Sequence, residues 1–126
     1  MKNLSVAVAA VAMIGSTAAW AGYKTSNPVT VNSSTKEASG PIGYARNSPD
    51  FQQWIGCEIY GTLTGNFVRC YASTVAGTSA SCQTSNSNLL AVAMALNGDD
   101  FLTFRWDASG QCTELRAYKM SYWEPK

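Results

Sequence analysis

Residues 52–73 read QQWIGCEIYGTLTGNFVRCYAS, and the prediction of the fold starts from this stretch. Its two arms, 52–60 and 67–73, carry many β-branched and aromatic residues, and the segment 61–66 between them supplies turn residues. We therefore predict a β-hairpin. In its symmetric register Cys57 and Cys70 face each other at a Cβ separation that suits a disulfide, and a shift by one residue removes that pairing.

The chain after this hairpin continues with one more strand and then a helix. Residues 78–84 predict a third strand, and Thr84-Ser85-Asn86-Ser87 offers several N-cap side chains. A helix is predicted over 88–97, with Gly98 suited to the position just past its end. Its apolar arc is wide, so we expect the helix to be well buried or covered by a partner.

The last part of the chain predicts a second hairpin. Residues 101–106 form one strand, Asp107-Ala108-Ser109-Gly110 fits a type I turn, and residues 112–122 form the return strand. The order is strands, one helix, then strands. We predict an α+β fold in which one α-helix packs on a small antiparallel β-sheet, stapled by two disulfides.

Four cysteines, Cys57, Cys70, Cys82 and Cys112, are the disulfide candidates. They allow three pairings, and one of these joins the two arms of the first hairpin and ties the third strand to the last one. Their spacings contain no close Cys-x2-Cys knuckle, so disulfides are favoured over a zinc site. Each bridge stabilises a small domain by about 2–4 kcal/mol.

The first 21 residues have the features of a signal peptide. Lys2 gives a positive start, residues 4–14 are almost continuously apolar, and the Ala-Trp-Ala sequence at 19–21 places small residues around a bulky one. We expect a mature protein that begins at Gly22 and is exported to the periplasm or the extracellular space, where disulfides persist.

The mature chain divides into two parts. Residues 22–40 are rich in Ser, Thr, Asn and Lys and offer little to bury apart from Val29 and Val31, so we expect a flexible N-terminal segment or a short edge strand. Residues 41–126 form the disulfide-tied α+β domain.

Charge and hydropathy exclude two classes of partner. The chain has nine Lys and Arg against eight Asp and Glu, and cleavage removes Lys2, which leaves eight of each. A nucleic-acid-binding protein needs a basic surface, so no nucleic acid is expected as a partner. The longest mostly apolar run after the signal peptide is residues 89–96, so we expect no transmembrane segment in the mature chain.

The residue inventory argues against catalysis. The chain has no His, which removes the commonest general base and the commonest metal ligand. A pair of carboxylates is the remaining route to a hydrolase, and its candidate members are Glu58, Asp99, Asp100, Asp107 and Glu114. Turn and solvent-facing positions explain these carboxylates better, so we predict no enzyme, no cofactor and no metal.

Two features of the chain favour binding. Aromatic residues are dense, and most are expected in the core. Along the last strand, however, one face is shared by Arg116, Tyr118, Met120 and Tyr122, and we expect an exposed strip of aromatic and Arg side chains that could contact a protein or a sugar. Residues 70–98 contain no charge at all, which suits burial or an interface with a partner or with a second copy of the chain. An uncharged edge strand there would favour self-association.

Three short motifs carry a resemblance. Ala45-Arg46-Asn47-Ser48, Ile55-Gly56-Cys57 and Trp106-Asp107-Ala108-Ser109-Gly110-Gln111-Cys112 resemble a group of small uncharacterised proteins exported by Gram-negative bacteria, over about residues 40–126. The resemblance implies an exported product and a cysteine framework, and no activity. Arg46 and Asn47 fall in a predicted loop and are candidate recognition residues, or they hydrogen-bond that loop against the sheet.

The function predicted from these observations is that of an exported, non-enzymatic binding protein, such as an inhibitor or a surface-binding module. It would present aromatic and Arg side chains to a protein or a glycan on a rigid scaffold, which lowers the ordering cost of binding. The alternative is an extracellular structural subunit that assembles with itself. A carboxylate-dependent hydrolase is the third and least favoured hypothesis.

Overall fold

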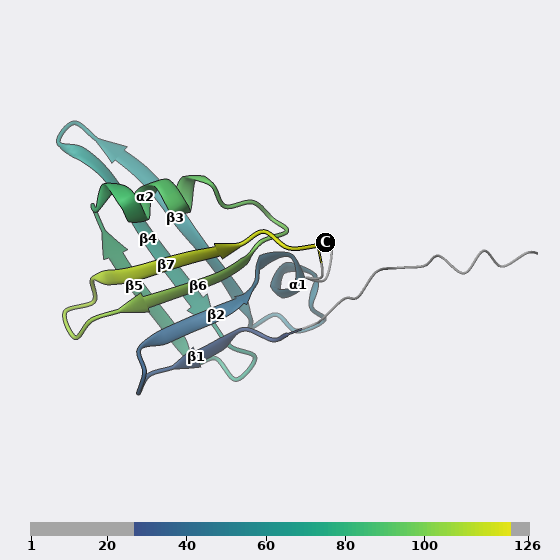
Figure 1. Cartoon of the computed structure of the whole chain (residues 1–126). Coiled ribbons are helices and arrows are strands. Elements are labelled where there is room, and N and C mark those ends of the chain that lie inside the picture. The colour runs from purple at the N-terminus through teal and green to yellow at the C-terminus, as the bar shows by residue number, and fades with distance from the viewer. Residues whose placement is uncertain (1–26, 122–126) are drawn as a thin grey trace, which may run out of the picture.

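The computed structural model describes residues 27–121, so the predicted signal peptide and Tyr122 lie outside the described residues. These residues form two antiparallel sheets and two helices (Figure 1). The larger sheet has the order β1-β2-β6-β7 and consists of β1 (Thr30–Asn32), β2 (Glu37–Pro41), β6 (Phe101–Trp106) and β7 (Cys112–Tyr118). The smaller sheet has the order β3-β4-β5 and consists of β3 (Trp54–Thr62), β4 (Gly65–Ser73) and β5 (Ser79–Thr84).

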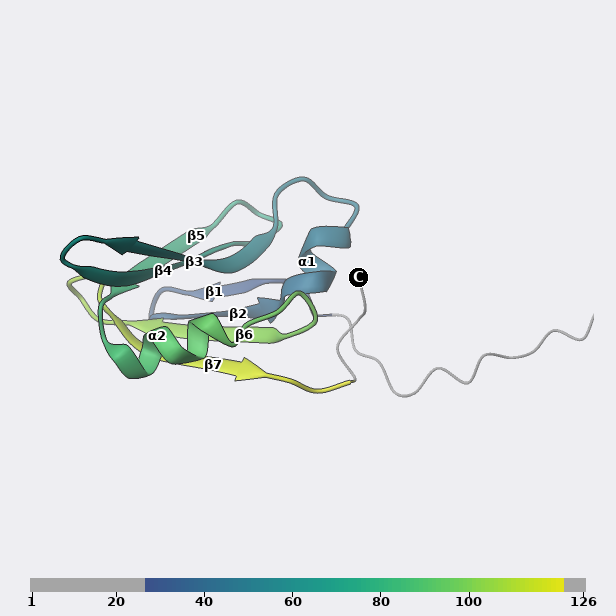
Figure 2. The ribbon, with the colours of Figure 1, turned by 90° about the horizontal axis from the view of Figure 1, so that it is seen from above.

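The two sheets lie one above the other, as Figure 2 shows. Helix α1 (Ile42–Asn47) connects the two layers at one end, and α2 (Ser87–Met94) runs along the side near β7. The α+β fold with two disulfides is confirmed, but it has two sheets and two helices where one of each was expected. Each hairpin has its own apolar face, and the two faces bury each other.

Both predicted hairpins form. In β3–β4, Cys57 pairs with Cys70, and the disulfide between them spans a Cα–Cα distance of 4.0 Å. In β6–β7, a register shift follows Arg105, and Gly110 closes the turn at a φ of 82°, which glycine adopts without strain. The second disulfide joins Cys82 of β5 to Cys112 of β7, so it links the two sheets.

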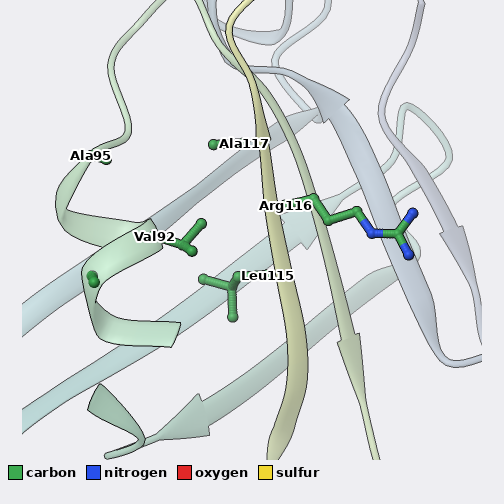
Figure 3. Close-up of a pocket in the computed structure, with 6 residues that line it drawn as sticks. Val92, Ala95, Leu115, Arg116 and Ala117 are labelled. Carbon is green, nitrogen blue, oxygen red and sulfur yellow. The ribbon is translucent and has the colours of Figure 1, made fainter. Parts of the chain in front are cut away.

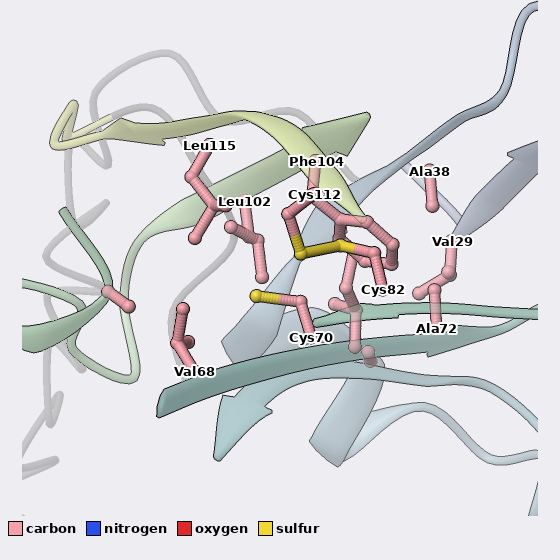
Figure 4. Close-up of a cluster of buried hydrophobic side chains, with 13 residues drawn as sticks. Val29, Ala38, Val68, Cys70, Ala72, Cys82, Leu102, Phe104, Cys112 and Leu115 are labelled. Carbon is pink, nitrogen blue, oxygen red and sulfur yellow. A yellow bond between two sulfur atoms is a disulfide. The ribbon is translucent and has the colours of Figure 1, made fainter. Parts of the chain in front are cut away.

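The core lies between the sheets (Figure 4). Phe104 and Leu102 of β6 face Val68 and Cys70 of β4, and all four side chains are completely buried. The sulfurs of Cys82 and Cys112 sit in the middle of this cluster. At about 25 cal/mol per Å² of apolar area, this shared burial is the main force that holds the layers together.

For the N-terminal segment the edge-strand alternative is confirmed, because β1 is a short edge strand of the four-stranded sheet, and the flexible alternative is wrong for the described residues. Residues 22–26 lie outside the described residues, but 30–32 and 37–41 are strands and not a flexible segment, and β2 is an inner strand between β1 and β6. Val29 and Ala38 are buried in the core. A Cβ at Gly40 would come within 3.0 Å of the Val29 side chain, so small residues allow this close approach.

Helix α2 is shorter and more exposed than predicted. The Asn86 side chain caps it by accepting hydrogen bonds from the amides of Asn88 and Leu89. The helix ends at Met94 and not at Asn97, because the Asn97 amide donates to the Asp100 carboxylate and turns the chain toward β6. Within α2 only Ala93 is buried, so the apolar arc is partly open to solvent.

Candidate binding surface

Arg46 and Asn47 lie at the end of α1 and not in a loop, which corrects the prediction. Both side chains are exposed, and α1 contacts β2 and β3. The six-residue helix begins after the extended Pro41, and its small residues Gly43 and Ala45 are buried.

Arg116 and Tyr118 lie on the outer face of the four-stranded sheet, as predicted, and Tyr122 is outside the described residues. Arg116 forms an ion pair with Glu114. A hydrogen bond with the Tyr118 hydroxyl, together with the Glu114 charge, raises the pKa of Arg116. Arg46 and Asn47 belong to α1 at the end of the layers, so the predicted recognition residues do not form one cluster.

Charged pairs cover this outer face. We call it the charged face and define it by Glu37, Arg105, Glu114, Arg116 and Tyr118. Arg105 Nε lies 2.6 Å from Glu37 Oε2, and Arg105 Nη1 lies 3.9 Å from Glu114 Oε2. These side chains remain partly exposed, and their charges neutralise one another. Such ion pairs are typical of an ordinary hydrated protein surface.

The outer face of the three-stranded sheet has a different chemistry. The strand registers place side chains from all three strands on this side, opposite in phase to the buried Cys70, Ala72 and Val68. We call it the aromatic face and define it by its large side chains: Trp54, Glu58, Tyr60, Phe67, Arg69, Tyr71 and Gln83.

A polar chain crosses the middle of the aromatic face from β3 to β5. Arg69 donates from Nε to the Gln83 amide oxygen at 3.0 Å and from Nη1 to the Tyr71 hydroxyl at 3.3 Å. The Tyr71 hydroxyl in turn lies 3.4 Å from a carboxylate oxygen of Glu58. The contact with Tyr71 is the main reason why the pKa of Arg69 is raised. The Arg69 side chain is therefore fixed by hydrogen bonds to side chains of β4 and β5.

Two aromatic pairs flank this polar chain. The ring centroids of Trp54 and Tyr71 are 5.8 Å apart, and those of Tyr60 and Phe67 are 5.5 Å apart and stacked. The Arg69 guanidinium lies 5.9 Å from the centre of the Tyr60 ring, within the range of a cation–π contact. Trp54 remains 49% exposed.

A shallow pocket of about 300 Å³ opens beside Trp54 and Tyr71. Its other side chains come from Ser79 and Ser81 of β5, and its floor is formed around Ala72 and Ala80. Phe51 and Val75, both exposed, belong to the loops at the same end of the sheet, because Trp54 pairs with Ser73 at the last rung of the β3–β4 ladder.

A second pocket, of about 520 Å³, lies between α2 and β7 (Figure 3). Val92 and Leu115 point toward each other across it, and Ala91, Ala95 and Ala117 complete its apolar wall. The Arg116 side chain points to the other side of β7. This pocket exists because α2 is only partly covered.

The candidate carboxylates are distributed over separate parts of the fold. Glu58 and Glu114 lie on the outer faces of different sheets, and Asp107 occupies the β6–β7 turn. Asp100 is buried and pairs with Lys119 at 2.8 Å. Over residues 27–121, no cluster of three metal-ligating side chains occurs.

The prediction that most aromatic residues lie in the core is wrong for β3 and β4. On β3, Trp54 and Tyr60 point to the side of the sheet opposite to Cys57. On β4, Phe67 and Tyr71 point to the side opposite to Cys70. A disulfide-forming pair in a small domain tends to be buried. The alternation of the aromatic residues with the cysteines is therefore the feature of the sequence that predicts the aromatic face.

Among the described helices, none combines the length and the apolar character needed to cross a bilayer. No known protein-family model, curated protein or solved structure matches this chain.

Proposed function

We propose that this chain is an exported, non-enzymatic binding protein that contacts a macromolecule through its aromatic face. The observation that carries the proposal is the set of four aromatic rings on the outside of the three-stranded sheet, of which Trp54 is exposed and Tyr60, Phe67 and Tyr71 are partly exposed. Large amphipathic rings give much contact area for little loss of side-chain entropy, and for this reason they dominate binding hot spots.

The scaffold beneath the aromatic face supports this role. The Cys57–Cys70 disulfide ties β3 to β4, and the Cys82–Cys112 disulfide ties β5 to the opposite sheet. Hydrogen bonds among Arg69, Tyr71 and Gln83 fix the central side chains before any partner arrives. A preorganised surface loses less entropy on binding, which favours affinity.

Two disulfides also agree with export. Disulfides persist in the periplasm and outside the cell, and are rare in the cytosol. The signal-peptide features of residues 1–21 and the resemblance to exported proteins of Gram-negative bacteria support the same location.

Affinity capture from periplasm and culture medium tests the proposal. The bait is the oxidised mature protein, compared with a Trp54→Ala/Phe67→Ala variant of the aromatic face and an Arg116→Ala/Tyr118→Ala variant of the charged face. We expect a specific partner that the wild type and the charged-face variant retain and the aromatic-face variant loses. If only the charged-face variant lost the partner, the binding surface would be on the four-stranded sheet, and the proposed surface would be wrong. If no bait retained a specific partner, the proposed function itself would be contradicted.

Strand β5 supports a second candidate function, a subunit that assembles with itself. It is an edge of the three-stranded sheet and contains no charged residue, so its open backbone groups suit strand addition. A hydrogen bond from the backbone amide of Gln83 to the carbonyl of Gly110 occupies only one end of the open edge of β5. Light scattering over a concentration series distinguishes the two functions, since a protein that stays monomeric is not an assembling subunit.

A further inference from the structure

We propose that the aromatic face binds an uncharged glycan, and that one pyranose ring of it occupies the pocket beside Trp54 and Tyr71. This inference rests on the proposed function and adds the chemical class of its ligand. The pocket volume of about 300 Å³ is at the lower end of the range for small-molecule sites, roughly 300–1,000 Å³. It suits a single ring-sized group and is too small for a folded element of a partner.

The walls of the pocket match the two kinds of surface that a pyranose presents. A sugar ring has an apolar face of C–H groups, which carry a small positive charge, and the face of an aromatic ring is negative. Trp54 is 49% exposed beside Tyr71, and its indole offers the largest such platform on this sheet. Stacking of a pyranose on Trp54 would remove apolar area from water on both partners.

The edge of a sugar ring carries hydroxyl groups, which both donate and accept hydrogen bonds. The rim of the pocket provides Ser79 and Ser81, whose hydroxyls have the same dual capacity. Tyr71 also lines the pocket and pairs with Ser81 across the strands, and its hydroxyl is already oriented by its contacts with Arg69 and Glu58. These groups allow the equatorial hydroxyls of the ligand to exchange water for protein partners at little cost.

Charge selects an uncharged ligand. On the aromatic face Arg69 and Glu58 are the charged residues, and the Tyr71 hydroxyl links them. Their charges cancel, so the face is electrostatically complementary to a neutral polymer. An aromatic platform for single-stranded nucleic acid needs a basic groove along the phosphates, which this face does not provide.

The surface around the rings is open in the direction of an extended chain. Gly56 lies across from Tyr71, and a Cβ at that position would meet nothing within 4 Å. Trp54 and Tyr60 are six residues apart on β3, which corresponds to about 20 Å along the strand. The aromatic face is therefore long enough for several linked sugar units.

Affinity gel electrophoresis and calorimetry test the inference with oxidised mature protein. The neutral probes are hydroxyethyl cellulose, laminarin and dextran, and the anionic probes are alginate and oligo-dT. We expect at least one neutral probe to bind, with little dependence on salt. Trp54→Ala should weaken that binding at least tenfold, and Ser81→Val, which replaces a rim hydroxyl with methyl groups on a side chain that suits a strand, should weaken it as well.

Leu63→Ala is the matched control, because Leu63 is fully exposed in the β3–β4 turn, away from the pocket. It should bind like the wild type, and circular dichroism should show that all three variants are folded. Neutral glycan binding that survives both Trp54→Ala and Ser81→Val would overturn the assigned pocket. Salt-sensitive binding of the anionic probes alone would overturn the ligand class.

The inference and the proposed function fail separately. If none of the neutral probes binds but a protein partner is captured through the aromatic face, the glycan inference is wrong and the proposed function stands. If nothing is captured and no probe binds, both are wrong.

Discussion

The outer faces of the two sheets have the same backbone architecture and opposite chemistry. On the charged face, Arg105 and Arg116 pair with Glu37 and Glu114, and the side chains remain partly exposed to water. On the aromatic face a single arginine, Arg69, lies between the two aromatic pairs and donates its hydrogen bonds to Gln83 and Tyr71. The charges of the first face are paired with one another, whereas the second face leaves Trp54 exposed and three further rings partly exposed to water.

This difference identifies the sheet on which binding should be sought. Ion pairs on an exposed surface contribute about 0–1 kcal/mol and are screened by salt, so the charged face provides mainly solubility. Exposed rings on a rigid sheet keep an unfavourable contact with water until a ligand covers them. The two outer faces keep a fixed relation to each other only if the two sheets form one rigid unit. The contacts that join the sheets should therefore have the largest effects on stability.

The disulfides should give the largest effect on stability. Cys82–Cys112 closes a separation of 30 residues and joins the sheets, whereas Cys57–Cys70 closes 13 residues within one sheet. Loop-closure entropy predicts a loss of about 4 kcal/mol for Cys82→Ala/Cys112→Ala and about 3 kcal/mol for Cys57→Ala/Cys70→Ala. Urea unfolding followed by tryptophan fluorescence measures both. A larger loss for the Cys57–Cys70 variant would mean that the three-stranded sheet, and not the junction of the layers, is the weak point.

The buried carboxylate of Asp100 should give the next largest effect. It is 2% exposed, it accepts the Asn97 amide, and it pairs with Lys119, whose ammonium also reaches the Ala95 carbonyl. Lys119→Met leaves this charge without its cation and should cost about 2 kcal/mol, less than a fully buried pair because Lys119 is half exposed.

The matched variants for this pair are Asp100→Asn and the double substitution. Asn keeps an acceptor for the Asn97 amide and carries no charge, so Asp100→Asn/Lys119→Met should be more stable than Lys119→Met alone. Equal stabilities for these two variants, measured in the same urea experiment, would show that the ion pair does not fasten α2 to the four-stranded sheet.

The parts of the fold that the sequence predicts are the local ones. Turn residues and alternation define both hairpins, and the symmetric register of the first one places Cys57 opposite Cys70. The pairing of β2 with β6 is not local, since Glu37 and Arg105 are 68 residues apart. The burial of Ala38 and the close approach at Gly40 give little hydrophobic signal, so the segment 30–41 reads as polar and flexible although it is part of the sheet.

In the candidate site, too, the sequence predicts the local features and misses those that depend on contacts between distant segments. Alternation along one strand is local, and the register of β7 accordingly places Arg116 and Tyr118 on the same side of the sheet. The aromatic face was missed because both sides of β3 and β4 carry apolar residues, and alternation alone does not say which side is buried. The second sheet decides it, by covering the side that carries Cys70 and Val68.

The smallest effect we predict concerns pH and the β6–β7 turn of the four-stranded sheet. The Asp107 carboxylate accepts hydrogen bonds from the Ser109 hydroxyl and from the amides of Ser109 and Gln111. These bonds, the one from the Ser109 hydroxyl first, lower the pKa of Asp107 below its ordinary value of 3.8. A lowered pKa in the fold means that the carboxylate contributes stability at neutral pH and loses that contribution as the pH falls through the folded value.

Asp107→Asn should therefore be slightly less stable than the wild type at pH 7, and the difference should shrink toward zero as the pH is lowered below 3.8. Asp107→Ala should be less stable than Asp107→Asn at every pH, because it also removes the acceptor for the turn amides. Thermal unfolding from pH 7 to pH 2 measures both variants. Glycan binding by Asp107→Asn at pH 7 should equal that of the wild type, since this turn belongs to the sheet that carries the charged face. A loss of binding would show that the two faces do not act independently.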